Sequence, residues 1–129
     1  MKILFINNSS RFKQEHILFK RLGYISDEDI CHFEKYEDIK HKVTQLNDYS
    51  VVIYDNTDEE EMSCDEFLLN MSHKICGLKI MFVSSNKKIR ELLKVHNDIN
   101  FMVKNNNYMS LLKERKCIGE LLLQQKGIQ

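Results

Sequence analysis

Five short apolar runs, separated by longer stretches with helical spacing, constrain the fold of this chain more than any other feature. The runs have four or five residues each, are rich in Ile, Val and Phe, and are nearly continuous rather than alternating. They cover residues 3–6, 30–33, 51–54, 80–83 and 99–103. Such runs are typical of strands with both faces buried, as in a parallel sheet. The sequence therefore predicts five buried strands.

The stretches between the runs have the spacing of amphipathic helices. The first helix is predicted over about residues 10–22 and ends at Gly23, because glycine readily adopts the left-handed conformation that follows a helix. Asn86 is predicted to be the N-cap of a later helix, and the last helix begins near Asn107. The apolar stripes of the four later helices are Tyr36, Ile39, Val43 and Leu46; Cys64, Leu68, Met71 and Ile75; Ile89, Leu92, Leu93 and His96; and Leu111, Leu112, Ile118 and Leu122.

This alternation of strands and helices predicts an α/β protein. In chain order the elements are βαβαβαβαβα, and parallel strands joined by helices form an open, doubly wound sheet with helices on both faces. The 129 residues suit one domain, which at this size buries roughly two-thirds of its unfolded surface. We therefore expect residues 1–129 to form a single domain, either alone or as the N-terminal part of a longer regulator.

Composition and charge exclude several classes of protein. No apolar run approaches the roughly 18 residues of a membrane span, and residues 1–6 are too short for a secretory signal. The 19 basic and 19 acidic residues give a net charge of zero, so direct nucleic-acid binding is not expected. The four cysteines form no CxxC pair, which favours reduced thiols and a cytoplasmic location. A zinc site at Cys64, His73 and Cys76 matches no established ligand spacing.

Polar side chains that follow the predicted strands are candidates for a functional site. Ligands of open α/β sheets bind beyond the carboxyl ends of the strands, where Asn7, Asn8, Asp55, Ser84 and Lys104 stand. Asp55 has the chemistry to attack a phosphoryl group and form a mixed anhydride. Lys104 would compensate phosphoryl charge, and Ser84 would bind a phosphoryl oxygen. Alternatively, these residues only begin loops, and Asp55 caps the next helix.

Three segments at the ends of predicted strands resemble one known family. They are Val-Val-Ile-Tyr-Asp at 51–55, Phe-Val-Ser-Ser at 82–85 and Phe-Met-Val-Lys at 101–104. In type, order and spacing they resemble the receiver domain of bacterial two-component response regulators, the CheY-like family, over nearly the whole chain. The resemblance implies a flavodoxin/CheY-like sheet in the order 2-1-3-4-5. It also implies a module of phosphorelay signal transduction rather than a turnover enzyme.

The resemblance assigns roles to individual residues. It implies that Asp55 is the phosphoacceptor and that Ser84 and Lys104 contact the phosphoryl group. Phe101 matches the aromatic switch residue of the family. The implied partner is a sensor histidine kinase or another signalling protein, and the implied dimer face consists of the last two helices and the fifth strand.

The chain departs from the family at the expected Mg²⁺ site. Two acidic residues normally follow the first strand and hold the ion together with the phosphoacceptor and a backbone carbonyl, which here is that of Thr57. Asn7 and Asn8 stand in their place, so the expected ligand set is Asn7, Asn8, Asp55 and Thr57. Mg²⁺ favours carboxylates, and a unit charge pair about 4 Å apart contributes roughly 4 kcal/mol at an effective dielectric of about 20. We therefore expect Mg²⁺ binding, and phosphoryl transfer through it, to be weakened.

Asp58 and Glu59 offer one route by which the lost charge would be restored. They follow Asp55 closely and would complete the metal site if they turned towards it. The simpler interpretation is that these acids favour the positive N-terminus of the next helix.

Three functions remain open at the level of sequence. The first is an atypical receiver, weakly phosphorylated or independent of phosphorylation, that acts through protein partners or dimerisation. The second is a receiver that accepts a phosphoryl group on Asp55 with Mg²⁺. The third is a flavodoxin-like small-molecule module, in which residues 7–11 would cradle a phosphate at a helix N-terminus. This last segment lacks the glycine that close backbone approach usually requires, and no aromatic pair is placed to enclose a flavin ring.

Overall fold

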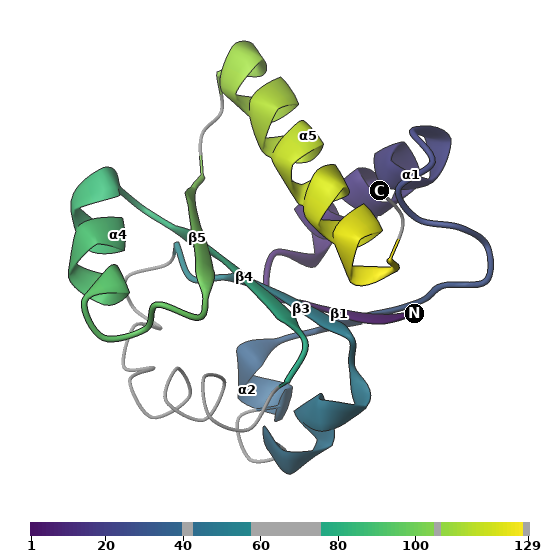
Figure 1. Cartoon of the computed structure of the whole chain (residues 1–129), viewed down its shortest axis with the longest axis horizontal. Helices are drawn as coiled ribbons and strands as arrows, with labels where there is room; N and C mark the ends of the chain where they lie inside the picture. The colour runs from purple at the N-terminus through teal and green to yellow at the C-terminus, as the bar shows by residue number, and fades with distance from the viewer. Residues whose placement is uncertain (40–42, 58–75, 105–106, 128–129) are drawn as a thin grey trace.

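The computed structural model describes residues 1–39, 43–57, 76–104 and 107–127, and its core is a five-stranded sheet (Figure 1). The strands are β1 (Lys2–Ile6), β2 (Ile30–Glu34), β3 (Val51–Asp55), β4 (Leu78–Val83) and β5 (Asn100–Val103). All neighbouring strands are parallel, and their order is β2-β1-β3-β4-β5. The predicted α/β class, parallel sheet and strand order are therefore confirmed.

The prediction that every strand is fully buried is wrong for the two edge strands. In β1, β3 and β4 nearly all side chains are buried, as in the run from Val51 to Asp55. Side chains of β2 alternate between exposed and half-buried, and those of β5 are half-buried or exposed. An edge strand has a neighbour on only one side, so apolar composition alone does not decide its burial.

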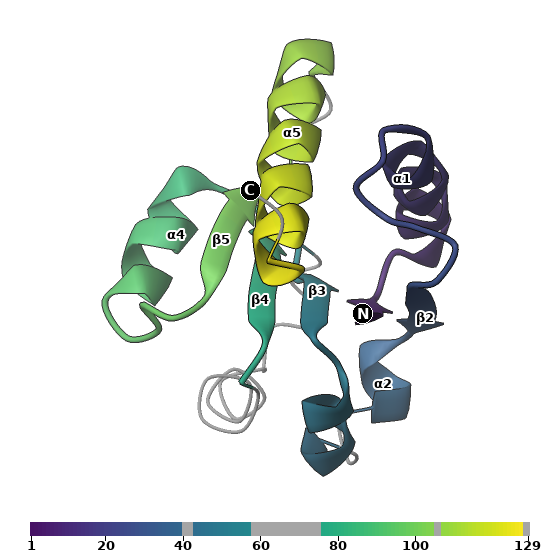
Figure 2. The same cartoon turned by 45° about the vertical axis from the view of Figure 1, so that its right-hand side comes forward.

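Helices cover both faces of the sheet, as predicted. They are α1 (Ser9–Arg21), α2 (Tyr36–Ile39), the 3₁₀ helix η1 (Val43–Asp48), α4 (Asn86–Leu93) and α5 (Tyr108–Gln125). Figures 1 and 2 show α1 and α5 on one face and α2 and α4 on the other. Among the residues described, no helix is long and apolar enough to cross a membrane.

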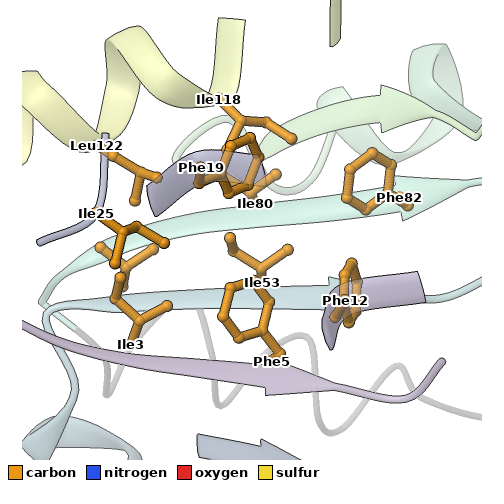
Figure 3. Close-up of a cluster of buried hydrophobic side chains, with 11 residues drawn as sticks. Ile3, Phe5, Phe12, Phe19, Ile25, Ile53, Ile80, Phe82, Ile118 and Leu122 are labelled. Carbon is orange, nitrogen blue, oxygen red and sulfur yellow. The ribbon is translucent and has the colours of Figure 1, made fainter. Parts of the chain in front are cut away.

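The two faces of the sheet form two separate hydrophobic clusters, because successive side chains of a strand point to opposite faces. On the α1 and α5 side, Ile3 and Phe5 of β1 pack with Phe12 of α1 and Leu122 of α5 (Figure 3). On the other side, Leu4 of β1 packs in the cluster that includes residues of α2, η1 and α4. Both clusters therefore include side chains of the same three central strands, β1, β3 and β4.

Two helix ends lie where the sequence predicts them, and a third lies one residue away from its predicted position. Gly23 has φ +80° directly after the C-cap of α1, and Asn107 caps α5 by accepting hydrogen bonds from Met109 N and Ser110 N. The predicted N-cap Asn86 is wrong: it is the first residue of α4, and Ser85 Oγ accepts the hydrogen bond from Lys88 N. Ser85 has the extended backbone that an N-cap requires, and serine caps as well as asparagine does.

Two of the predicted helices are described only in part or not at all. The second stripe covers α2 and η1, with Ile39 and Leu46 buried as expected. The third stripe, from Cys64 to Ile75, lies outside the described residues, as do Asp58, Glu59 and His73.

One glycine fits α5 against the segment that follows α1. A Cβ atom at Gly119 would overlap the ring of Tyr24, so any larger side chain at this position requires the ring to move. Glycine in a helix interior lowers helix stability by roughly 1 kcal/mol relative to alanine. Here the absence of a side chain allows α5 to pack closely against Tyr24.

Candidate functional site

The carboxyl ends of β1, β3 and β5 bring the predicted polar residues together. Parallel pairing sets Ile6 beside Tyr54, so the residues that follow β1 and end β3 are neighbours. An open depression of about 500 Å³ lies at this edge of the sheet. Its lining residues are Asn7, Asn8, Ser9, Ser10, Lys35, Asp55, Thr57 and Lys104.

Asp55 is buried at the centre of this site, with 4% of its surface exposed. Its Oδ2 atom accepts a hydrogen bond from Asn8 Nδ2 at 3.0 Å and forms an ion pair with Lys104 Nζ at 3.2 Å. Its Oδ1 atom accepts hydrogen bonds from Thr57 N at 3.1 Å and Thr57 Oγ1 at 2.5 Å. Both carboxylate oxygens are therefore engaged by groups of the protein itself.

These contacts keep Asp55 ionised. Burial by itself would raise its pKa, but the hydrogen bonds from Thr57 and Asn8 and the charge of Lys104 lower the pKa below its ordinary value of 3.8. A buried carboxylate that is paired and hydrogen-bonded in this way is a stable anion rather than an exposed nucleophile.

The two asparagines hold the loop between β1 and α1. Both have positive φ, 64° for Asn7 and 40° for Asn8, a conformation that asparagine adopts more readily than most residues. Asn7 Nδ2 donates to the Asp55 carbonyl at 3.3 Å, while Asn7 Oδ1 accepts from Tyr36 N at 2.8 Å. Asn7 thus connects the ends of β1 and β3 to the start of α2.

The residues present do not fit the Mg²⁺ ion that the family resemblance implies. Asn7 Oδ1 is occupied by Tyr36 N, and Asn8 presents an N–H group rather than an oxygen to Asp55. Both Asp55 oxygens also accept hydrogen bonds, and Mg²⁺ requires free oxygen ligands in near-octahedral geometry. Across the described ranges no cluster of three or more His, Cys, Asp or Glu side chains is arranged to hold a metal.

The structure does not bring all predicted site residues together. Ser84 follows β4 and is exposed, and it does not line the depression. Phe101 is half-buried in β5, packs against the hydrophobic cluster on the α4 side and lines a different hollow, described below. Of the suggested zinc ligands only Cys76 is described, and it is exposed.

The sequence prediction omitted Lys35 of the depression, and it included Ser9 and Ser10 only through the flavodoxin-like alternative. Lys35 follows β2 at the same edge of the sheet, and Ser9 and Ser10 begin α1. Lys35 would have been found by reading the carboxyl end of the second strand in the same way as the others. The lining within the described part of the chain contains no aromatic side chain, so nothing there favours the flavin alternative.

A second polar cluster joins α1 to α5 beside the site. Arg11 forms an ion pair with Glu114, and Arg115 Nε lies 3.0 Å from Glu15 Oε2. The Arg11 guanidinium lies 4.4 Å from the ring centroid of Phe82, the β4 residue paired with Asp55. Burial raises the pKa of Glu114 to about 7, because the positive charge of Arg11 offsets burial only in part and Glu15 raises the pKa further.

A wider hollow of about 710 Å³ lies between α4, β5 and α5. Phe101 and Met102 of β5 line it together with Glu114 and Leu121 of α5. Leu93, at the end of α4, also lines it and is 44% exposed. This is the face at which the sequence predicts partner docking or dimerisation.

Comparison of the sequence with protein-family models and with curated proteins gives no match. The function must therefore be inferred from the fold and from the geometry at the carboxyl edge of the sheet.

Proposed function

We propose that this chain is an atypical receiver domain that acts in signal transduction through protein contacts, without phosphorylation of Asp55 and without Mg²⁺. The observation that carries the proposal is the full engagement of Asp55: Asn8 and Lys104 occupy one carboxylate oxygen, and Thr57 occupies the other. A phosphoryl group would have to displace these contacts before a bond to Asp55 could form.

The Lys104–Asp55 ion pair supplies the link from the site to a docking face. Lys104 directly follows β5, and its backbone N–H donates to Val83 O at 3.0 Å, which fixes this end of β5 on β4. Phe101 and Met102 of the same strand line the hollow between α4 and α5. The ion pair thus holds β5, and with it the face for a protein partner, in one arrangement.

The partner is a signalling protein, either a sensor kinase or a second copy of this chain. Exposed apolar side chains in the segments that contribute to the hollow favour protein contacts there. Leu93, which lines the hollow, and Val95 lie in and after α4, and Met109 and Leu112 lie in α5. In this function the domain is not a turnover enzyme, and we expect it to act in the cytoplasm.

An NMR titration with Mg²⁺ and beryllofluoride, which mimics a phosphoryl group on aspartate, tests the proposal. We expect no saturable shift of the Ser84, Phe101 or Lys104 amides at millimolar Mg²⁺. In a second arm, Lys104→Met is expected to move the Phe101 and Met102 resonances, whereas Lys94→Met at the end of α4 leaves them in place.

Saturable shifts that vanish in Asp55→Ala would support the alternative, a receiver that is phosphorylated on Asp55. A Lys104→Met variant with unchanged Phe101 and Met102 resonances would contradict the link from the site to β5. A yellow chromophore that copurifies with the protein would instead favour the flavodoxin-like alternative.

A further inference from the structure

We propose that the depression beside Asp55 binds the phosphate group of a small phosphomonoester, non-covalently and without a metal ion. This inference deepens the function proposed above and rests on it, because it names the ligand that would regulate the same site. The bound phosphate would lie against Lys35, Lys104 and the hydroxyl groups of Ser9 and Ser10.

The charge of the lining favours an anion. Asp55 is the one carboxylate among the described lining residues, and Lys104 already balances its charge. Lys35 lines the same depression and forms no ion pair with any residue that the structure describes. The described lining therefore has one uncompensated positive charge, where a metal site requires an excess of negative charge.

The neutral lining residues are suited to an anion as well. Ser9 and Ser10 are exposed in the lining of the depression, and their hydroxyl groups are able to donate hydrogen bonds. Lys104 keeps 28% of its side chain exposed while it contacts Asp55, and an ammonium group has three donors. It can therefore bind Asp55 and an incoming phosphate together.

The size of the depression indicates more than an inorganic anion. Small-molecule sites have volumes of roughly 300–1,000 Å³, and about 500 Å³ falls within that range. A phosphate group alone would fill a small part of it. A sugar phosphate or a nucleoside monophosphate would place its phosphate at the lysines and its organic part against the remaining lining.

The acidic run Asp58–Glu61 follows Thr57 in the sequence and lies outside the described residues. Acidic side chains at such a site favour a divalent cation over an anion. The experiment therefore has to separate an anion site from a cation site.

The test is an NMR titration of the full chain at constant ionic strength with EDTA present. Inorganic phosphate, ribose 5-phosphate and adenosine monophosphate are added separately, with ribose as the phosphate-free probe. We expect saturable shifts of the Ser9, Ser10, Lys35 and Thr57 amides with the two esters, weaker binding of inorganic phosphate and no response to ribose.

Lys35→Gln is the decisive variant, and Lys94→Gln, directly after α4, is its matched control. Both lysines are exposed, so both variants should fold, which their unfolding temperatures will verify. Loss of one nearby charge is expected to weaken ester binding roughly tenfold in Lys35→Gln, whereas Lys94→Gln binds as the wild type does.

Three results would overturn the inference: equal weakening in both variants, shifts that do not saturate, or, in a separate titration without EDTA, a saturable response to Mg²⁺ alone. The last would also contradict the metal-free function proposed above. The first two would leave that function standing, because its own test uses beryllofluoride and the Phe101 resonances.

Discussion

Asp55 is a buried carboxylate whose charge is balanced by one lysine and by hydrogen bonds from neutral groups. Removal of the cation and removal of the carboxylate should lower the free energy of unfolding by unequal amounts. Without Lys104 the buried charge stays behind with hydrogen bonds alone, whereas without the carboxylate the ammonium group of Lys104 can turn towards water.

This asymmetry gives a prediction for two single variants and their combination. Lys104→Met is expected to lower the free energy of unfolding by about 2 kcal/mol, and Asp55→Asn by about 1 kcal/mol, because Lys104 is partly exposed. The double variant should lose less than the sum, since it leaves no unpaired charge. Urea denaturation at pH 7 measures all three, and strictly additive losses would show that the two residues do not interact.

The stabilising effect of Asp55 also has a defined pH range. Its pKa is lower in the folded protein than its ordinary value of 3.8, so its contribution is fully present above that value. The contribution is lost as the pH falls through the folded pKa.

At the scale of the elements, the start of α4 is a feature that sequence patterns alone do not predict. Ser85 and Asn86 are both good N-cap residues, and residue types alone do not separate them. The backbone conformation identifies Ser85 as the N-cap, because Ser85 is extended, with φ −159°, and Asn86 is already helical.

A pair of alanine variants tests this assignment. Ser85→Ala is expected to cost about 1 kcal/mol, because Lys88 N loses its side-chain acceptor. Asn86→Ala should be neutral or slightly stabilising, since alanine is the better helix former inside a first turn. Chemical denaturation compares the two variants, and a larger loss in Asn86→Ala would restore the cap predicted from the sequence.

At the scale of the whole molecule, the Arg11–Glu114 ion pair connects α1 to α5, which lie far apart in the chain and side by side on one face of the sheet. The pKa of Glu114 is raised from 4.5 to about 7, so the folded protein binds this proton more tightly than the unfolded chain does. Protonation of Glu114 therefore favours the folded state.

The consequence is a stability that depends on pH in a specific range. The contribution of Glu114 is largest below pH 4.5 and declines by about 3 kcal/mol as the pH rises to about 7. Glu114→Gln should remove this decline, while Glu120→Gln, an exposed position on the same helix, should keep it. Thermal unfolding between pH 4.5 and 8 measures the effect, and equal slopes in the wild type and Glu114→Gln would contradict it.

Much of the architecture could be predicted because periodicity records which faces are buried. The central strands and the convergence of Asn8, Asp55 and Lys104 followed from short local patterns, whereas the strand order followed from the family resemblance. The α1–α5 ion pairs could not be predicted, since charged residues at helical spacing look the same whether they face solvent or another helix. Exposure of β2 was missed for a related reason: it depends on position in the sheet, not on composition.

The contact between Gly119 and Tyr24 places a joint condition on any relative of this protein. A side chain larger than hydrogen at position 119 requires a smaller or displaced ring at position 24, so the residues at these two positions should vary together. Gly119 lies in α5 and Tyr24 follows α1, so no local sequence pattern reveals the packing contact between them. Where short motifs are too weak to find distant relatives, this correlated pair offers a criterion that depends on shape rather than on chemistry.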